Sequence, residues 1–298
     1  MITKPTVLVL GAGASVDYGY PSGKALKQQV INAIGDALTP EHGRLVELGH
    51  DREQIESFRE ALRYSGKPSV DAFLEYRSEY VDIGKKAMAQ VLIRHESKPS
   101  LFSANSDWYE YLYGRLGAPF DRFHLNTLSV VTFNYDRSLE AFLFEALRNS
   151  YGKASAEVAL MLRAIEIVHV HGQLGSLPWD EKPGRDYTPT QDPREIRIAA
   201  QGIRVIHEGQ RNDGVFARAT ALIRSAERVI FLGFGYHDAN LMRLNLKLDN
   251  EHQEILGTCY GFTERERSEI DGKFKPRGIQ LGRIHWPVLS FLREMITL

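Results

Sequence analysis

The chain has 298 residues, of which 43% are hydrophobic and 25% are charged, and its formal net charge is −1 at pH 7. This length is enough to bury a full core, and it allows one large domain or a domain with a large insertion. The near-zero charge excludes a global basic surface that would attract nucleic acid or membranes. The single cysteine, Cys259, excludes an internal disulfide, a four-cysteine zinc module and a Cys-x-x-Cys redox site.

No apolar segment of the chain has the length of a targeting or membrane signal. The first apolar run, Thr6–Leu10, is too short for a signal peptide or a membrane span. Later segments also fall short of the roughly 18 uninterrupted apolar residues that a span requires. We therefore expect a cytoplasmic protein in a reducing environment, with no membrane partner and no direct nucleic-acid partner.

Short apolar runs rich in β-branched residues recur along the chain, and helical patterns follow them. Near-continuous apolar runs are typical of parallel strands that are covered on both faces. The alternation of strands with helices predicts an α/β fold with a parallel sheet and helices on both faces. The expected strands are Thr6–Leu10, Leu128–Thr132, Ile165–Val170, Ile203–His207, Arg228–Leu232 and Cys259–Phe262.

The interval between the first two expected strands breaks this alternation, because its apolar residues recur at helical spacing. The repeat is clearest at Leu26, Val30, Ile34 and Leu38. We interpret residues 25–126 as a helical insertion, which includes a helix at Asp107–Leu116, in a sheet domain of residues 1–24 and 127–298. The prolines of Leu177–Arg197 predict a long loop or flap instead.

A glycine-rich loop, Gly11–Ser15, follows the first expected strand directly. Glycine lets the backbone turn sharply, and successive amides at a helix N-terminus can hold a diphosphate. The loop lacks the third glycine of the dinucleotide fingerprint, because Val16 stands there, and it is not a Walker loop. A tight strand-to-helix turn without a ligand is the alternative. A second rigid turn, Gly19–Gly23, contains Pro21 and Ser22.

Asn134 and Asp136 follow the second expected strand, two residues apart. In extended backbone both side chains point to one side of the strand. Asn134 can orient a water or a sugar hydroxyl, and Asp136 can accept hydrogen bonds from an amide. The alternative is that Asp136 caps a helix at Arg137–Leu147.

Two histidines, His169 and His171, follow the third expected strand. A metal site would need a third ligand from His207 or His237, and the chain has no His-Glu-x-x-His motif. We therefore expect no metal. Hydrogen bonding or proton transfer by His171, which stands next to a glycine at the strand end, is favoured. His169 is expected to be a core or supporting residue.

A second glycine pair, in Gly233-Phe234-Gly235, follows the strand expected at Arg228–Leu232. These glycines also allow the backbone to approach a ligand closely, and Asp238 can cap a helix at Ala239–Leu248. The alternative is a turn with a purely structural left-handed residue. Because a parallel sheet binds ligands beyond the carboxyl ends of its strands, the four motifs are expected to meet at one edge.

The order of these four motifs resembles that of the sirtuin-like NAD-binding family. The resemblance implies a Rossmann-like domain that binds NAD as an extended substrate. For the diphosphate it implies contacts from Gly11, Ala12, Gly13 and Ser15, and for the adenosine half it implies Gly233 and Phe234. The expected NAD-binding set is completed by Pro21, Ser22 and Gly235.

The same resemblance implies a catalytic set of three side chains. Asn134 would lie by the nicotinamide ribose and Asp136 by the carboxamide. His171 would lie at the ribose hydroxyls, as a general base or a positioning group.

The chain departs from the protein-deacylating sirtuins at several positions. It lacks their four-cysteine zinc module, so no zinc is expected, and Gly19–Lys24 lacks the arginine of their Gly-x-Pro-x-Phe-Arg segment. Phe133 replaces the glutamine that precedes their asparagine. These departures resemble a zinc-free branch of bacterial antiphage defence proteins that hydrolyse NAD, and Ser69–Leu74 also resembles that branch.

The resulting hypothesis is an NAD hydrolase that produces nicotinamide and ADP-ribose. The alternatives are a non-catalytic module that senses NAD or ADP-ribose, and an NAD-dependent deacylase. A constantly active NAD hydrolase would be lethal, so we expect regulation by homo-oligomerisation or by a separately encoded partner such as an ATPase.

Overall fold

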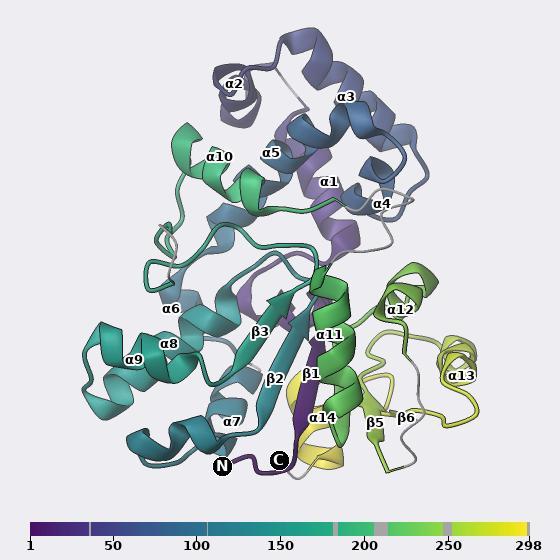
Figure 1. Ribbon diagram of the computed structural model, residues 1–298. Helices are drawn as coiled ribbons and strands as arrows, with labels where there is room; N and C mark the ends of the chain where they lie inside the picture. The colour runs from purple at the N-terminus through teal and green to yellow at the C-terminus, as the bar shows by residue number, and fades with distance from the viewer. Residues whose placement is uncertain (36, 106, 181–183, 206–213, 247–251, 297–298) are drawn as a thin grey trace.

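A single parallel sheet forms the centre of the molecule (Figure 1). The computed structural model describes residues 1–35, 37–105, 107–180, 184–205, 214–246 and 252–296. Six strands of these residues pair in the order β3-β2-β1-β4-β5-β6, which is the strand order of a doubly wound Rossmann fold. The predicted α/β fold is therefore confirmed. The strands are β1 (Thr6–Leu10), β2 (Leu128–Thr132), β3 (Glu166–His169), β4 (Arg228–Leu232), β5 (Glu254–Gly257) and β6 (Gln280–Leu281).

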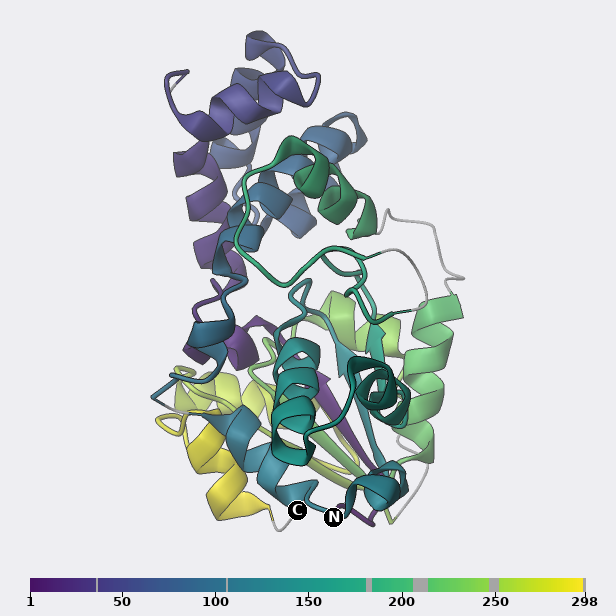
Figure 2. The ribbon, with the colours of Figure 1, turned by 90° about the vertical axis from the view of Figure 1, so that its left-hand side faces the viewer.

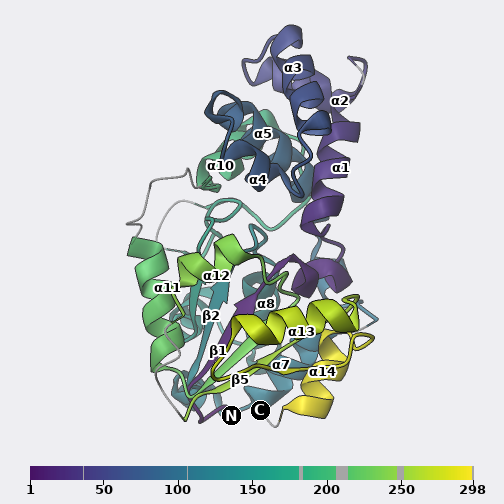
Figure 3. The same ribbon diagram turned by 90° about the vertical axis from the view of Figure 1, so that its right-hand side faces the viewer.

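Helices cover both faces of the sheet. Every residue of β1 is buried, and its side chains alternate between the two faces, so each face needs a covering layer of helices. Val7 and Val9 face one group of helices, α11 (Gly214–Ser225), α12 (Asp238–Leu244) and α13 (Glu264–Lys273). Leu8 and Leu10 face another group, α7 (Trp108–Arg115), α8 (Ser138–Tyr151), α9 (Ser155–Leu162) and α14 (Val288–Met295). Figure 3 shows the first group with the strands behind it.

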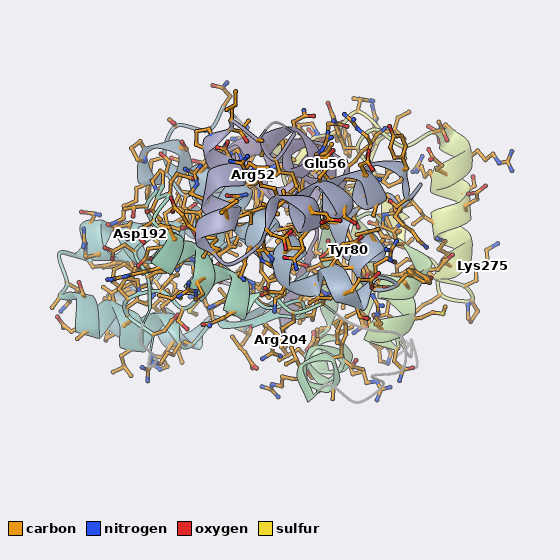
Figure 4. The ribbon with its side chains drawn as sticks, turned by 90° about the horizontal axis from the view of Figure 1, so that it is seen from above. Arg52, Glu56, Tyr80, Asp192, Arg204 and Lys275 are labelled. Atoms are coloured by element: carbon orange, nitrogen blue, oxygen red, sulfur yellow. The ribbon has the colours of Figure 1, made fainter. Side chains whose placement is uncertain are left out.

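The helical insertion stands above the carboxyl ends of the strands (Figures 1 and 2). Its longest helix is initiated by a capping box between Asp51 and Gln54, and it buries Ile55, Phe58 and Leu62 along one face. Seen from above, Arg52, Glu56 and Tyr80 lie over the middle of the molecule, with Asp192 and Lys275 toward opposite sides (Figure 4). The helices of the insertion are α1 (Gly23–Ala33), α2 (Pro40–Glu47), α3 (Arg52–Tyr64), α4 (Val70–Leu74), α5 (Val81–Leu92) and α6 (Lys98–Leu101).

Two further helices complete the arrangement of the insertion and the sheet domain. Helix α7 lies within the residues 25–126 that were interpreted as the insertion but packs on the sheet domain, where the Trp108 indole donates a hydrogen bond to the Ala14 carbonyl at 2.8 Å. Helix α10 (Pro193–Gly202) lies beside α5 of the insertion, far along the chain from it (Figure 1). The N-terminus and the last helix, α14, lie at the opposite end of the molecule from the insertion.

Three expectations for the chain are wrong in part. The segment Ile203–His207 is not a strand of the sheet: Ile203 makes only an isolated antiparallel bridge to Gly172, and residues 206 and 207 lie outside the described residues. The strand expected at Cys259–Phe262 lies earlier, at β5, because Ile255 and Leu256 pair with β4. Cys259 instead follows that strand and donates to the Gly282 carbonyl.

The third correction concerns Leu177–Arg197, whose last residues are helical rather than part of a flap. Asp192 caps α10 by accepting a hydrogen bond from the Arg194 amide, and Pro193 occupies the first helical position, where its missing N–H costs nothing. Ile196 and Ala199 are buried. The proline that suggested a loop therefore starts a helix.

No helix among the described residues is long and apolar enough to cross a membrane.

A fully buried cluster of charges, Glu96, Arg137 and Arg185, joins the insertion to the sheet domain. The Arg137 Nε and Nη2 donate to Glu96 Oε1 at 2.9 and 2.7 Å, and Arg185 Nη1 donates to Glu96 Oε2. Arg137 also donates to the carbonyls of Ser176 and Arg185, at 2.9 and 3.0 Å. One carboxylate therefore ties the segment between α5 and α6 of the insertion to the start of α8 and to the loop before α10.

We expect Glu96→Ala to lower the free energy of unfolding by about 3–5 kcal/mol, because removing one partner leaves two buried guanidinium groups uncompensated. Urea unfolding followed by circular dichroism measures this. Glu269→Ala removes a carboxylate from an exposed ion pair with Arg265 and is the matched control. Equal effects of the two substitutions would contradict the role of the cluster.

Candidate active site

A cavity of about 880 Å³ lies at the carboxyl ends of the strands, beneath α4 of the insertion. Pockets of this size hold cofactors and other small molecules. Residues one or two positions beyond the ends of five strands contribute to its wall: Gly11, Asn134, His171, Gly233 and Thr258. The remaining wall includes Ser69, Asp71 and Glu75 from the insertion. The motifs of the sequence thus meet at one edge of the sheet.

The two glycine loops in this wall interlock. The Gly11 amide donates to the Leu232 carbonyl and the Gly13 amide to the Gly233 carbonyl, each at 3.0 Å. A Cβ atom on Gly11 would lie 2.6 Å from the Gly233 oxygen, and Gly233 itself has φ of +57°. These glycines are therefore required for the close contact between the loops, whether or not a ligand is bound.

Asn134 is held by both hydrogens of its side-chain amide. Nδ2 donates to the Gly11 carbonyl at 3.0 Å and to Ser15 Oγ at 3.1 Å. The side chain lines the cavity at 8% exposure, and Oδ1 has no partner among the described residues. The amide is therefore fixed in one orientation, with its oxygen available to a ligand.

Ser15 and Asp136 lie behind Asn134 and outside the wall of the large cavity. The Ser15 hydroxyl donates to Asp136 Oδ2 at 2.8 Å, and Asp136 Oδ1 accepts from the amide and hydroxyl of Ser138. Burial raises the pKa of Asp136 above its usual value, although the hydrogen bonds from Ser138 and Ser15 oppose this. Asp136 accordingly supports the start of α8, next to its N-cap Arg137, and orients Asn134 through Ser15.

The two histidines have different surroundings. His169 bridges the Asn134 carbonyl, 3.0 Å from Nδ1, and the Glu140 carboxylate at Nε2. Burial alone would lower the pKa of His169, but Glu140 and the Asn134 carbonyl outweigh it and raise the pKa. His169 thus supports the backbone of Asn134, with each of its ring nitrogens facing an oxygen.

His171 lines the cavity, and neither of its ring nitrogens has a hydrogen-bond partner among the described residues. Its ring stands edge-on to Phe133 and Phe216, at centroid distances of 5.5 and 6.1 Å. Burial lowers the pKa of His171 below its usual 6.5; Asp71 opposes this shift and Arg243 adds to it. The imidazole is therefore neutral at pH 7 and able to accept a proton.

Some of the other expected site residues line the cavity and some do not. Pro21 does not line the cavity, whereas Ser22 does so and also caps α1 by accepting from the Ala25 amide. Members of both glycine loops line it as well: Ala12, Gly13, Phe234 and Gly235. Within the part of the chain that the structure describes, no group of three His, Cys, Asp or Glu side chains could hold a metal ion. His237 is the N-cap of α12, while His207 lies outside the described residues.

Sequence reasoning missed several charged groups of the wall. Asp71 and Glu75 come from α4, and Glu75 forms an ion pair of 2.9 Å with Arg243 of α12. The sequence distinguishes Ser69–Leu74 only by its resemblance to the zinc-free defence branch and predicts no role for any of its residues. Nothing in the local pattern of α12 distinguishes Arg243 from an exposed surface arginine.

No family model matches the chain, and no curated protein matches it. It is similar to a solved structure of a mutant Sir2 homologue in complex with 2'-O-acetyl ADP ribose, with 14% identity, a TM-score of 0.43, and coverage of 96% of this chain and 88% of that chain. It is also similar to Sir2Tm bound to a propionylated peptide, with 15% identity, a TM-score of 0.37, and coverage of 97% and 90%. At these TM-scores, function has to be argued from the residues of this chain.

We expect Gly233→Ala to prevent stable folding, with a cost above about 4 kcal/mol, because the new Cβ would lie 2.0 Å from the Ala14 amide nitrogen. Gly261→Ala is the matched control, since Gly261 also has a positive φ of +78° but no atom within 4 Å of the added Cβ. The control should cost roughly 1–2 kcal/mol. Thermal unfolding of both variants tests this, and equal midpoints would refute the interlocking of the loops.

Proposed function

We propose that this protein hydrolyses the bond between nicotinamide and ribose in NAD, producing nicotinamide and ADP-ribose. The observation that carries the proposal is the meeting of Asn134 and His171 with two glycine loops in one cavity of about 880 Å³. NAD is then a substrate, and the reaction needs no zinc. The predicted resemblance to the zinc-free defence branch agrees with this, and we extend it to a role in antiphage defence.

The reaction passes through a transition state with oxocarbenium character, as in glycoside hydrolysis. The bond between ribose C1' and the ring nitrogen breaks, and its electron pair returns to the nicotinamide ring. The oxygen of a water then bonds to C1', and one proton of that water is released. Asn134 Oδ1 can accept a hydrogen bond from a ribose hydroxyl or from this water, and neutral His171 can accept the proton.

The glycine loops would lie along the diphosphate, although four of their amides, those of Gly11, Gly13, Ala14 and Gly233, already donate within the protein. The amide of Gly13 donates to Gly233, and the amide of Ala14 donates to Gly11. We therefore assign phosphate binding to the remaining backbone of Gly11–Ser15 and to the side chains at the mouth of the cavity. Asp136 acts in this proposal through Ser15 and Asn134, and it does not touch the carboxamide.

An enzyme of this kind depletes NAD, so its activity has to be controlled. We propose that self-association or a separately encoded partner such as an ATPase supplies this control. The activity assay therefore includes the free chain, its oligomers separated by size, and the chain mixed with the product of each neighbouring gene.

We expect Asn134→Ala and His171→Ala each to lower kcat/KM for nicotinamide release at least about 100-fold, because each removes a group that contacts the reacting ribose or water. Nicotinamide is measured by chromatography. Asn32→Ala and His124→Ala remove the same side chains from exposed positions and are the matched controls.

Background activity in the wild type, with and without its partners, would contradict the proposal. Tight binding of NAD without turnover would then identify a sensing module. Consumption of NAD that requires an acylated lysine peptide would identify a deacylase.

The pKa of His171 determines the acid side of the pH profile. Because burial lowers this pKa below 6.5, the imidazole stays neutral through pH 7 and becomes protonated only at lower pH. We expect kcat/KM to be constant near neutrality and to fall as the pH drops through a pKa below 6.5. A fall that begins above pH 7 would exclude His171 as the proton acceptor.

A further inference from the structure

The roof of the cavity comes from α4 of the insertion, which begins at the N-cap Ser69 and places Asp71 and Glu75 in the cavity wall. Figures 1 and 3 both show α4 above α12, and the ion pair between Glu75 and Arg243 joins the two helices at 2.9 Å. The insertion is thereby held across the opening above Asn134 and His171.

One oxygen of Asp71 is fixed by Tyr135, the residue next to Asn134 in the chain. The Tyr135 hydroxyl donates to Asp71 Oδ1, and the tyrosine is 7% exposed. Burial raises the pKa of Tyr135 well above its usual value, and the adjacent Asp71 adds to this, so the phenol remains a donor. The Asp71 carboxylate is therefore oriented by the same segment that carries Asn134.

The second oxygen of Asp71 has no partner among the residues that the structure describes, and no cation among them pairs with this carboxylate. The neighbouring Glu75 differs, because Arg243 neutralises it. Asp71 and His171 both line the cavity, and the negative charge of Asp71 opposes the lowering of the His171 pKa. The charged groups that act on His171 are Asp71 from α4 and Arg243 from α12.

We propose that Asp71 is a catalytic residue that the insertion supplies to the site, with its free oxygen facing the ribose carbon from which nicotinamide departs. This inference rests on the proposed function. As the bond between C1' and the ring nitrogen breaks, its electrons return to nicotinamide and positive charge develops on the ribose. A carboxylate at that point stabilises the charge more than it stabilises the bound substrate. Water then bonds to C1', and its proton passes to His171.

The test compares Asp71→Asn with Asp82→Asn, which alters an exposed carboxylate of the same insertion outside the cavity. We expect Asp71→Asn to lower kcat about 100-fold while KM rises no more than about 10-fold, and to move the acid side of the pH profile to lower pH. Tyr135→Phe should lower kcat about 10-fold, since it frees the carboxylate without removing it. Asp82→Asn should match the wild type. An unchanged kcat in Asp71→Asn, or a rise in KM alone, would overturn the proposal.

A binding measurement separates this inference from the proposed function. In an Asn134→Ala background, which prevents turnover, calorimetry compares NAD with NADH, whose nicotinamide ring carries no positive charge. We expect about 10-fold tighter binding of NAD, and loss of that preference when Asp71→Asn is added. If the wild type hydrolyses no NAD, the proposed function fails, and this comparison alone decides: a preference unaffected by Asp71→Asn overturns the placement of Asp71.

Discussion

The close contact between the loops that follow β1 and β4 is the constraint on which the site depends. Gly11 and Gly13 pack directly on the backbone of Gly233, with hydrogen bonds of 3.0 Å between the loops. The two strands are neighbours in the sheet although Leu10 and Arg228 are far apart in the sequence. Because side chains are excluded there, the Gly11 carbonyl is available to hold Asn134, and space remains in front of it for a ligand.

A second connection positions the insertion over that space. The guanidinium of Arg137 binds Glu96 of the insertion and four carbonyls of the loop before α10, including those of Ser176 and Arg185. Arg137 directly follows Asp136, whose carboxylate bonds Ser15. Two consecutive residues at the start of α8 therefore hold the insertion on one side and the glycine loop on the other. The same point of the backbone therefore positions both the insertion above the cavity and the glycine loop below it.

The sheet could be predicted best where burial is complete. The expected bounds of β1, β2 and β4 agree with the structure to the residue, because these central strands are nearly continuous apolar runs. The edge of the sheet could not be predicted in this way. Strand β6 has only two residues, and β5 is bounded by a glutamate and a glycine, so pairing with neighbours decides where they form.

The same distinction applies to the site. Asn134, His171 and the glycine loops could be found because the carboxyl ends of parallel strands meet at one edge, so order in the sequence predicts proximity. Asp71 follows no strand, and its place in the cavity wall depends on how the insertion docks. Ser15 and Asp136 could be located near the site but not oriented, because their position behind Asn134 depends on packing with Ser138.

The fixed amide of Asn134 has a consequence for what the cavity can recognise. Both amide hydrogens are used within the protein, so the group offers a ligand only an acceptor. The open oxygen of Asp71 is likewise an acceptor, and neutral His171 has one acceptor nitrogen. This part of the wall is therefore complementary to a molecule that presents hydroxyl or ammonium donors. Carboxylates and phosphates would meet lone pairs there, so this part of the wall favours hydroxyl groups over anionic groups.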